Sequence, residues 1–202
     1  MRLLSFLSDF LFPQKYRLPK SLPQASPAEN AQALFDYGDK RVKELVWEIK
    51  YKGNKELAEK IGIMLYDTIV AEAEENNIFE KFGEVIIMPI PISDRRRLDR
   101  GWNQAELLTK AIKRMDTANR FKHLAGQLRK MKHTESQTST ATRKERLTNI
   151  QNSMKVANPQ SVRGACVALI DDVTTTGATF KEGVRALREA GAKKIMCFAI
   201  AH

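Results

Sequence analysis

Two adjacent acids, Asp171 and Asp172, follow an unbroken apolar run at residues 167–170 and precede a segment rich in threonine. Ionised carboxylates only accept hydrogen bonds, which suits the hydroxyl groups of a sugar. Backbone N–H groups and threonine hydroxyls donate to a phosphate. The segment that offers them consists of Thr174, Thr175, Thr176, Gly177, Ala178 and Thr179. This order predicts a sugar-phosphate site. The alternative, an acid that caps a helix beside a turn, needs only one acid and no preceding apolar strand.

A second candidate site lies between residues 91 and 104, where four arginines precede the start of a predicted helix. The guanidinium group of arginine binds phosphate oxygens with two hydrogen bonds, and a helix N-terminus favours negative charge. The segment therefore suits a pyrophosphate, and the alternative is an exposed basic loop that binds nothing. The candidate residues are Ser93, Asp94, Arg95, Arg100, Gly101, Asn103 and Gln104.

The spacing of apolar side chains indicates which elements position these residues. Residues 167–173 have the continuous apolar character of a strand buried on both faces, and residues 180–190 have helical spacing. The remaining pattern predicts a helical hairpin at 39–69 with a break at Gly53, a helix at 103–115, and strands at 85–90, 127–131, 154–156 and 194–200. Because strands alternate with helices, we expect an α/β fold with a mostly parallel central sheet flanked by helices. Ligands of such sheets bind outside the carboxyl ends of the strands, where the acids stand.

Composition divides the chain into three parts. Residues 1–36 contain an apolar stretch, predicted to be a helix, and a proline-rich linker; residues 37–80 are predicted to form a small helical cap, and residues 81–202 the core. Residues 132–149 are nearly devoid of apolar side chains and rich in Thr, Ser, Lys and Arg. Such a segment cannot pack a core, so we expect a mobile loop, which is often functional.

The net charge of +10 is concentrated in one part of the chain. Residues 95–146 hold 15 Lys and Arg against 5 Asp and Glu, so the rest of the chain is neutral overall. This distribution favours a surface that receives phosphates or nucleic acid, and the alternative is a solvated basic face.

Two features concern the compartment of the protein. Cys166 and Cys197 lie in apolar runs without the spacing of a zinc site or a redox dithiol, so we expect buried thiols in a reducing cytoplasm. The apolar residues near the start are interrupted by Ser8 and Asp9, which argues against a secretory signal. No run of about 18 apolar residues is present, so we expect a cytoplasmic protein without a membrane span.

Further motifs follow one another in a recognisable order. They are Tyr37, the group Leu45, Trp47, Lys50, Tyr51 and Gly53, the run at 89–93, the run at 100–104, the group Thr134, Gln137, Arg146 and Asn149, and the acid pair with its threonine segment. In this order they resemble the ComF/GntX competence-associated family of type I phosphoribosyltransferase-like proteins, over nearly the whole chain. The resemblance departs at residues 11–16, where typical members begin a four-cysteine zinc module, so we expect no zinc here.

The resemblance implies a function for each segment. Asp171 and Asp172 would carry the reaction by holding the ribose 2- and 3-hydroxyls of phosphoribosyl pyrophosphate, the threonine segment would hold its 5-phosphate, and the arginine segment its pyrophosphate. A nitrogen acceptor would displace pyrophosphate, with Mg²⁺ bound through substrate and water rather than by direct protein ligands. The mobile loop would close over the site with Thr134, Gln137, Arg143, Arg146 and Asn149.

Two other functions remain open at this stage. The chain could be a non-catalytic DNA-uptake protein whose basic face binds single-stranded DNA or a helicase partner, in which case Trp102 could stack with bases. The position of Trp102 within the motif favours a packing role instead. It could also sense the ribosyl donor without turning it over. The acceptor is not identified, and an oligomer is possible.

Overall fold

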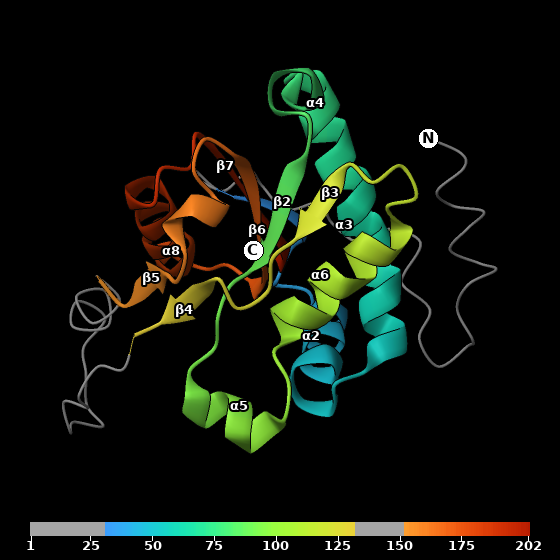
Figure 1. Ribbon diagram of the computed structural model, residues 1–202. Coiled ribbons are helices and arrows are strands. Elements are labelled where there is room, and N and C mark those ends of the chain that lie inside the picture. Colours follow the sequence, from blue (N-terminus) through green and yellow to red (C-terminus); the bar gives the residue numbers. More distant parts are fainter. Residues whose placement is uncertain (1–30, 132–151) are drawn as a thin grey trace.

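Five parallel strands form the centre of the structure, a computed structural model that describes residues 31–131 and 152–202. Their order is β1-β7-β6-β2-β3 (Figure 1), and each neighbouring pair runs parallel. The strands are β1 (Gln32–Phe35), β2 (Val85–Pro89), β3 (Phe121–His123), β6 (Cys166–Val173) and β7 (Lys194–Ala201). The predicted α/β fold with a mostly parallel sheet is therefore confirmed.

Strand β6 is the middle strand of this sheet. Its residue Ile170 pairs with Phe198 of β7 on one side and with Pro89 of β2 on the other. Asp171 pairs with Ala199, so the strand continues through the first acid and ends at Val173. The acid pair therefore stands at the carboxyl end of the most enclosed strand.

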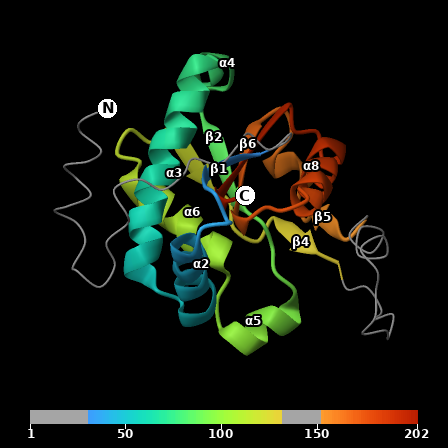
Figure 2. The same cartoon turned by 180° about the vertical axis from the view of Figure 1, so that it is seen from behind.

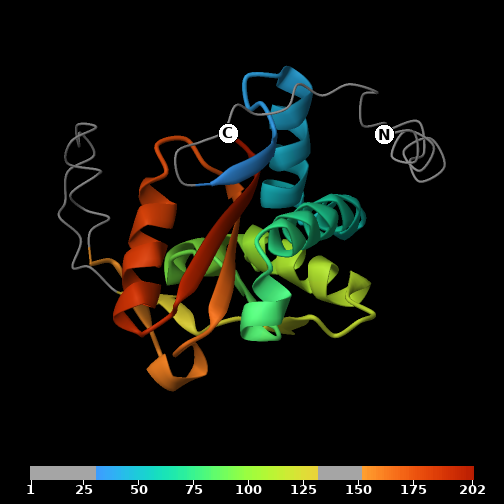
Figure 3. The ribbon, with the colours of Figure 1, turned by 90° about the horizontal axis from the view of Figure 1, so that it is seen from above.

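Helices and a small β-ribbon cover the two faces of the sheet (Figures 2 and 3). One face carries α2 (Lys40–Lys52), α3 (Lys55–Glu75) and α6 (Gln104–Met115), and the other carries α8 (Ala178–Glu189) and the antiparallel pair β4 (Leu128–Lys130) and β5 (Met154–Val156). Along β6, Cys166, Ala168 and Ile170 pack into the first layer, whereas Val167 and Leu169 pack into the second. Because side chains along β6 alternate between the two faces of the sheet, Asp171 and Asp172 lie next to different layers.

Short elements complete the fold. Helix α4 (Ile78–Phe82) precedes β2, helix α5 (Asp94–Arg100) follows it, and a 3-10 turn, η2 (Pro159–Ser161), precedes β6. Helix α4 therefore lies at the end where the strands begin, and α5 at the end where they finish (Figure 1). No helix in the described ranges has the length and apolar character needed to cross a bilayer.

Most predicted elements are present with small shifts of their ends. The helical hairpin is α2 and α3, and its break is Gly53, which adopts a left-handed conformation. The residues of both helices share one apolar core with the sheet, so the predicted cap lies directly on a sheet face. Cys166 and Cys197 are buried free thiols, as expected, and burial raises their pKa values to about 11 and about 12.

Four elements differ from the sequence-based expectation. The end of the linker predicted for residues 1–36 is instead strand β1, which gains its hydrogen bonds from β7. The predicted turn with four arginines is helix α5, which Ser93 caps by accepting a hydrogen bond from the backbone N–H of Arg96 (3.4 Å). Strand β3 and helix α4 were not predicted. The apolar stretch within residues 1–30 and the whole of the predicted mobile loop, residues 132–149, lie outside the described residues.

Replacement of Gly53 by alanine is expected to lower stability by about 1–2 kcal/mol or more. The residue has φ 61°, and a Cβ atom there would lie 2.9 Å from Cε2 of Trp102, so the strain of a left-handed alanine adds to a close contact. Gly126→Ala is the matched control, because Gly126 has φ 76° but no atom near its would-be Cβ. Urea unfolding of both variants measures the difference, and equal losses would contradict the role of Trp102.

Candidate functional site

The two acids at the end of β6 are buried and turn one oxygen each toward their own backbone. Asp171 is 8% exposed and Asp172 is 4% exposed. The Oδ1 atom of Asp171 accepts a hydrogen bond from the N–H of Asp172 (2.8 Å), and Oδ1 of Asp172 accepts one from the N–H of Val173 (2.9 Å). The Oδ2 atom of Asp172 is buried and has no hydrogen-bond partner among the described residues. A buried acceptor of this kind is costly unless a ligand satisfies it.

The acid pair has an unusual electrostatic environment. Burial raises the pKa of Asp171 well above its ordinary value, and the neighbouring charge of Asp172 raises it further, while the ammonium group of Lys50 acts in the opposite direction. Nζ of Lys50, on α2, lies 3.4 Å from Oδ2 of Asp172. Oδ2 of Asp172 can thus form an ion pair and still lack a hydrogen bond, because at 3.4 Å its contact with Lys50 is electrostatic rather than a well-formed hydrogen bond.

Lys130 approaches the pair from the other layer of the fold. It ends β4, and the pKa of its ammonium group is lowered by burial and by Arg96, while Asp171 raises it. Lys50 and Lys130 were not among the predicted site residues. Lys50 belongs to the motif group that resembles the family, but no local pattern links it or Lys130 to the acids.

The threonine segment follows the acids and leads directly into α8. Thr174 is buried, and its backbone N–H donates to the carbonyl of Ala201 (2.9 Å), which fixes the start of the segment against β7. Gly177 adopts a left-handed conformation before the helix and has no side chain that could cap it, while Oγ1 of Thr176 accepts a hydrogen bond from the N–H of Ala178 (3.4 Å). The N-terminus of α8, with the positive end of its dipole, therefore follows directly after the acids and the threonine segment.

Asn103 connects the end of β2 to the start of α6. Its Nδ2 donates to the carbonyl of Ile90 (2.9 Å), and its Oδ1 accepts from the N–H of Ala105 (3.0 Å). Asn103 and Gln104 are both buried. Asn103 thus caps the helix as its position suggested, and its amide is already engaged in the protein.

The other predicted pyrophosphate residues lie on or beside the short helix α5, which has no buried residue. Ser93 caps it, Asp94 and Arg95 form its exposed first turn, and Gly101 ends it with φ 81°. Arg100 Nη1 lies 3.5 Å from Oε1 of Gln104. The helix presents a row of cations at the end of the sheet where the acids stand (Figure 1).

Aromatic side chains beside α5 have two different roles. The indole Nε1 of Trp102 donates to the carbonyl of Ile49 (3.3 Å) and its ring contacts Gly53, so Trp102 is a packing residue. Trp47 and Tyr51, on the outer face of α2, are about half exposed, with ring centroids 5.8 Å apart. Arg100 lies over the Tyr51 ring at 4.8 Å. The exposed aromatic pair was not predicted as a nucleic-acid contact, because only the packing of α2 shows which of its aromatic side chains stay exposed.

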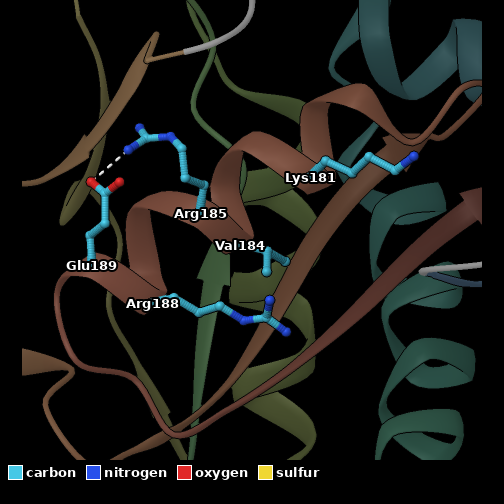
Figure 4. A pocket seen from close by; sticks show the side chains of 5 residues that line it. All are labelled: Lys181, Val184, Arg185, Arg188 and Glu189. Atoms are coloured by element: carbon cyan, nitrogen blue, oxygen red, sulfur yellow. Dashed lines mark ion pairs between the residues drawn. The ribbon is translucent and has the colours of Figure 1, made fainter.

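A separate hollow of about 360 Å³ runs along the outer side of α8 (Figure 4). Its walls include Lys181, Val184, Arg185, Arg188 and Glu189. Arg185 pairs with Glu189 (2.5 Å) and donates to the carbonyl of Met154 (2.8 Å), so it ties α8 to β5. Neither Asp171 nor Asp172 lines this hollow, so it is not part of the candidate site.

The structure thus brings together most of the described candidates at one edge of the sheet. The acid pair, the threonine segment, the end of β2 with Asn103, and α5 all follow the carboxyl ends of parallel strands. The remaining candidates, Thr134, Gln137, Arg143, Arg146 and Asn149, lie outside the described residues. The arrangement offers acceptors for hydroxyl groups between two regions of positive potential, which is what a phosphorylated sugar requires.

Part of the chain matches a known protein family. Residues 110–202 match the phosphoribosyl transferase domain. The chain is 35% identical over 123 residues to Competence protein F of Haemophilus influenzae, covering 60% of this chain and 51% of that protein. It is 26% identical over 166 residues to Competence protein ComFC of Bacillus subtilis (79% and 58%) and 32% identical over 126 residues to ComFC of Streptococcus pneumoniae (60% and 50%).

The chain therefore spans about half the length of the curated relatives it matches. Among solved structures, the allosteric regulatory enzyme of purine biosynthesis matches with a TM-score of 0.44 and 18% identity, over 77% of this chain and 30% of that one. A hypoxanthine phosphoribosyl transferase of Trypanosoma cruzi matches with a TM-score of 0.38 and 15% identity, over 87% and 71%.

Proposed function

We propose that this homologue of the ComF competence proteins, which carries a phosphoribosyl transferase domain, binds phosphoribosyl pyrophosphate with Mg²⁺ and transfers its phosphoribosyl group to a nitrogen acceptor. The observation that carries the proposal is the buried acid pair with an unsatisfied oxygen, Oδ2 of Asp172, shortly before the N-terminus of α8, whose N-cap residue is a glycine. A ribose hydroxyl would donate to that oxygen, and the 5-phosphate would lie on the N–H groups of the threonine segment.

The reaction would need little proton transfer by side chains. The bond between ribose C1 and the pyrophosphate oxygen breaks, a bond from the acceptor nitrogen to C1 forms, and both electrons of the broken bond leave with pyrophosphate. The arginines of α5 and Lys130 would neutralise the charge that develops on the leaving group. Asp171 and Asp172 would fix the ribose so that C1 faces the acceptor.

The site fits a divalent cation held mainly by the substrate. In the described ranges no group of three or more His, Cys, Asp or Glu side chains could hold a metal ion directly. Mg²⁺ prefers oxygen ligands and keeps several waters, so the carboxylate oxygens of Asp171 and Asp172 would contact those waters. Bound in this way, the ion would draw charge from the pyrophosphate oxygens.

One observation favours a second candidate function, the binding of single-stranded nucleic acid. Trp47 and Tyr51 are exposed on α2, and cations lie over their rings, with Lys52 5.0 Å from the Trp47 centroid. Bases stack on exposed aromatic rings, and nearby cations attract the backbone. Fluorescence anisotropy with a labelled single strand, for wild type and Trp47→Ala/Tyr51→Ala, tests this function, and equal affinities would exclude these residues from it.

Calorimetric titration of phosphoribosyl pyrophosphate with Mg²⁺ into the wild-type protein at fixed salt tests the main proposal. We expect one site with a dissociation constant roughly in the micromolar range, that is about −8 kcal/mol. Absence of binding would refute the proposal and leave nucleic-acid binding as the leading function. Binding without turnover across a panel of nitrogen bases would reduce the proposal to a sensor of the donor.

A further inference from the structure

Lys50 is the described cation that lies closest to the acid pair. Its ammonium group is 3.4 Å from Oδ2 of Asp172, and its side chain is 28% exposed while that of Asp172 is 5% exposed. The same oxygen lacks a hydrogen-bond partner among the described residues. Lys50 therefore holds a buried charge from one side without filling the position where a hydroxyl donor would bind.

The charges around the acids come from both layers of the fold. Lys50 approaches from α2, and Lys130 approaches from β4, where its electrostatic neighbours are Asp171 and Arg96 of α5. On the β7 side lies His202. Its backbone N–H donates to the carbonyl of Phe35, and its carbonyl accepts from the N–H of Tyr37. Among the described residues, the ion pair with Lys50 is the one that involves either acid.

The ribose role demands ionised acids, because a protonated carboxyl group loses part of its acceptor capacity. Two adjacent buried carboxylates repel one another and resist ionisation. One opposite charge at ion-pair distance reduces that cost by stabilising the ionised form. Lys50 supplies this charge from the helix that covers the site, so the geometry links α2 to the state of the acid pair.

We propose that Lys50 is a positioning residue that keeps the acid pair ionised, and so able to accept the ribose hydroxyls, through its ion pair with Asp172. This inference rests on the proposed donor site. Asp172 remains the group that touches the ribose, and Lys50 acts through it. A purely structural role, in which the ion pair only anchors α2 to β6, predicts a loss of stability but no change in the titration of the acids.

The first test uses the ligand-free protein, so that it does not depend on donor binding. Carbon NMR of the aspartate carboxyl groups, followed from about pH 3 to about pH 9, gives the apparent pKa values of the pair in wild type and in Lys50→Met. We expect the substitution to raise the higher apparent pKa by about one unit, which is a tenfold change in the ionisation equilibrium. Lys50→Arg should restore the wild-type titration. Unchanged titration in Lys50→Met would overturn the proposal.

The second test measures the binding of phosphoribosyl pyrophosphate with Mg²⁺ as a function of pH. We expect Lys50→Met to move the acidic limb of the binding profile upward by about one unit and to approach wild-type affinity at high pH. Lys81→Met is the matched control, because Lys81 lies on α4 at the opposite end of the sheet, where its Nζ donates to the carbonyl of Asn76 (3.1 Å). A loss of donor affinity that is equal at every pH would show a structural role of Lys50 instead. Absence of donor binding in the wild type would refute the donor site, and the NMR titration would then decide on the role of Lys50.

Discussion

The double variant Asp171→Asn/Asp172→Asn is expected to bind phosphoribosyl pyrophosphate with Mg²⁺ roughly a hundredfold or more weaker than wild type. Each ribose hydroxyl would lose a hydrogen bond to a charged group, worth about 1.5–3 kcal/mol, and the lost negative charge also removes the attraction for the cation. Asparagine keeps an Oδ1 acceptor for the N–H groups of Asp172 and Val173, so the end of β6 should keep its backbone contacts. Calorimetric titration beside wild type measures the loss.

The same variant should be more stable than wild type at neutral pH. The pKa of Asp171 is raised in the folded protein by burial and by Asp172, so the folded state binds a proton more tightly than the unfolded chain does. Its contribution to stability is therefore present at low pH and is lost as the pH rises through the folded pKa. The amides remove this loss, and a gain of about 1 kcal/mol would raise the unfolding midpoint by about 2–4 °C. Thermal unfolding at two pH values checks the sign, because the gain should shrink toward low pH.

Asp116→Asn is the matched control, because Asp116 is also buried but has a structural role. Burial raises its pKa, but a hydrogen bond from Lys113 and the N–H groups of Phe121 and Arg120 outweigh this effect and lower it overall. It lies before β3, at the edge opposite the candidate site. We expect this variant to lose stability and keep its donor affinity. If instead it lost affinity, or the double variant kept it, the assignment of the ribose to Asp171 and Asp172 would fail.

The candidate site could be predicted from the sequence because Asp171 and Asp172, unlike Asp116, directly follow an apolar run. The short, β-branched apolar run before Asp171 favours a buried strand, and acids at its end would be costly without a ligand. Helix α8 has a clear apolar face in Phe180 and Leu187, so its start, and hence the threonine segment, could be placed from spacing alone. These signals are local in the sequence, and the structure confirms the elements they predicted.

The elements that were missed depend on contacts with distant parts of the chain. Strand β1 is only four residues long and is defined by its pairing with β7, through Gln32 and Phe198 among others. Helix α5 has no apolar face, so periodicity cannot show it; its ends are set by Ser93 and Gly101, and Arg97 pairs with Glu106 (2.9 Å). Local patterns carry no information on such pairings.

The same reason explains why Lys50 was not assigned to the acids. Helix α2 places it near Asp172 only after the helix has packed on the sheet through Val46 and Ile49. Lys130 interacts electrostatically with Asp171 from the opposite layer, at the end of a strand of three residues. The residues of such a site can thus be predicted where they directly follow a buried strand in the sequence. They cannot be predicted where they belong to elements, such as α2 and β4, that pack over the sheet.

The position of α2 and α6 over the site depends on close packing between α3 and α6, which we expect Gly62→Ala to disrupt. A Cβ atom on Gly62 would overlap the Cβ of Ala111, and both atoms sit directly on helix backbones that cannot give way. Alanine favours a helix by about 1 kcal/mol over glycine, yet overpacking costs about 1–3 kcal/mol, so we expect a net loss of stability. Urea unfolding measures it.

Two further variants separate overpacking from other effects of the added methyl group. Ala111→Gly removes the opposing methyl group, so the double variant Gly62→Ala/Ala111→Gly should recover most of the packing loss, with a coupling energy of about 1–3 kcal/mol in the double-mutant cycle. Gly183→Ala is the control within a helix, because its Cβ would meet the flexible ends of side chains, those of Leu169, Ile90 and Leu128 at 3.1, 3.2 and 3.6 Å. Because α6 begins at Asn103, which holds the end of β2, the Gly62→Ala variant should also bind the donor more weakly. Additive effects of Gly62→Ala and Ala111→Gly would show that the two helices do not depend on this contact.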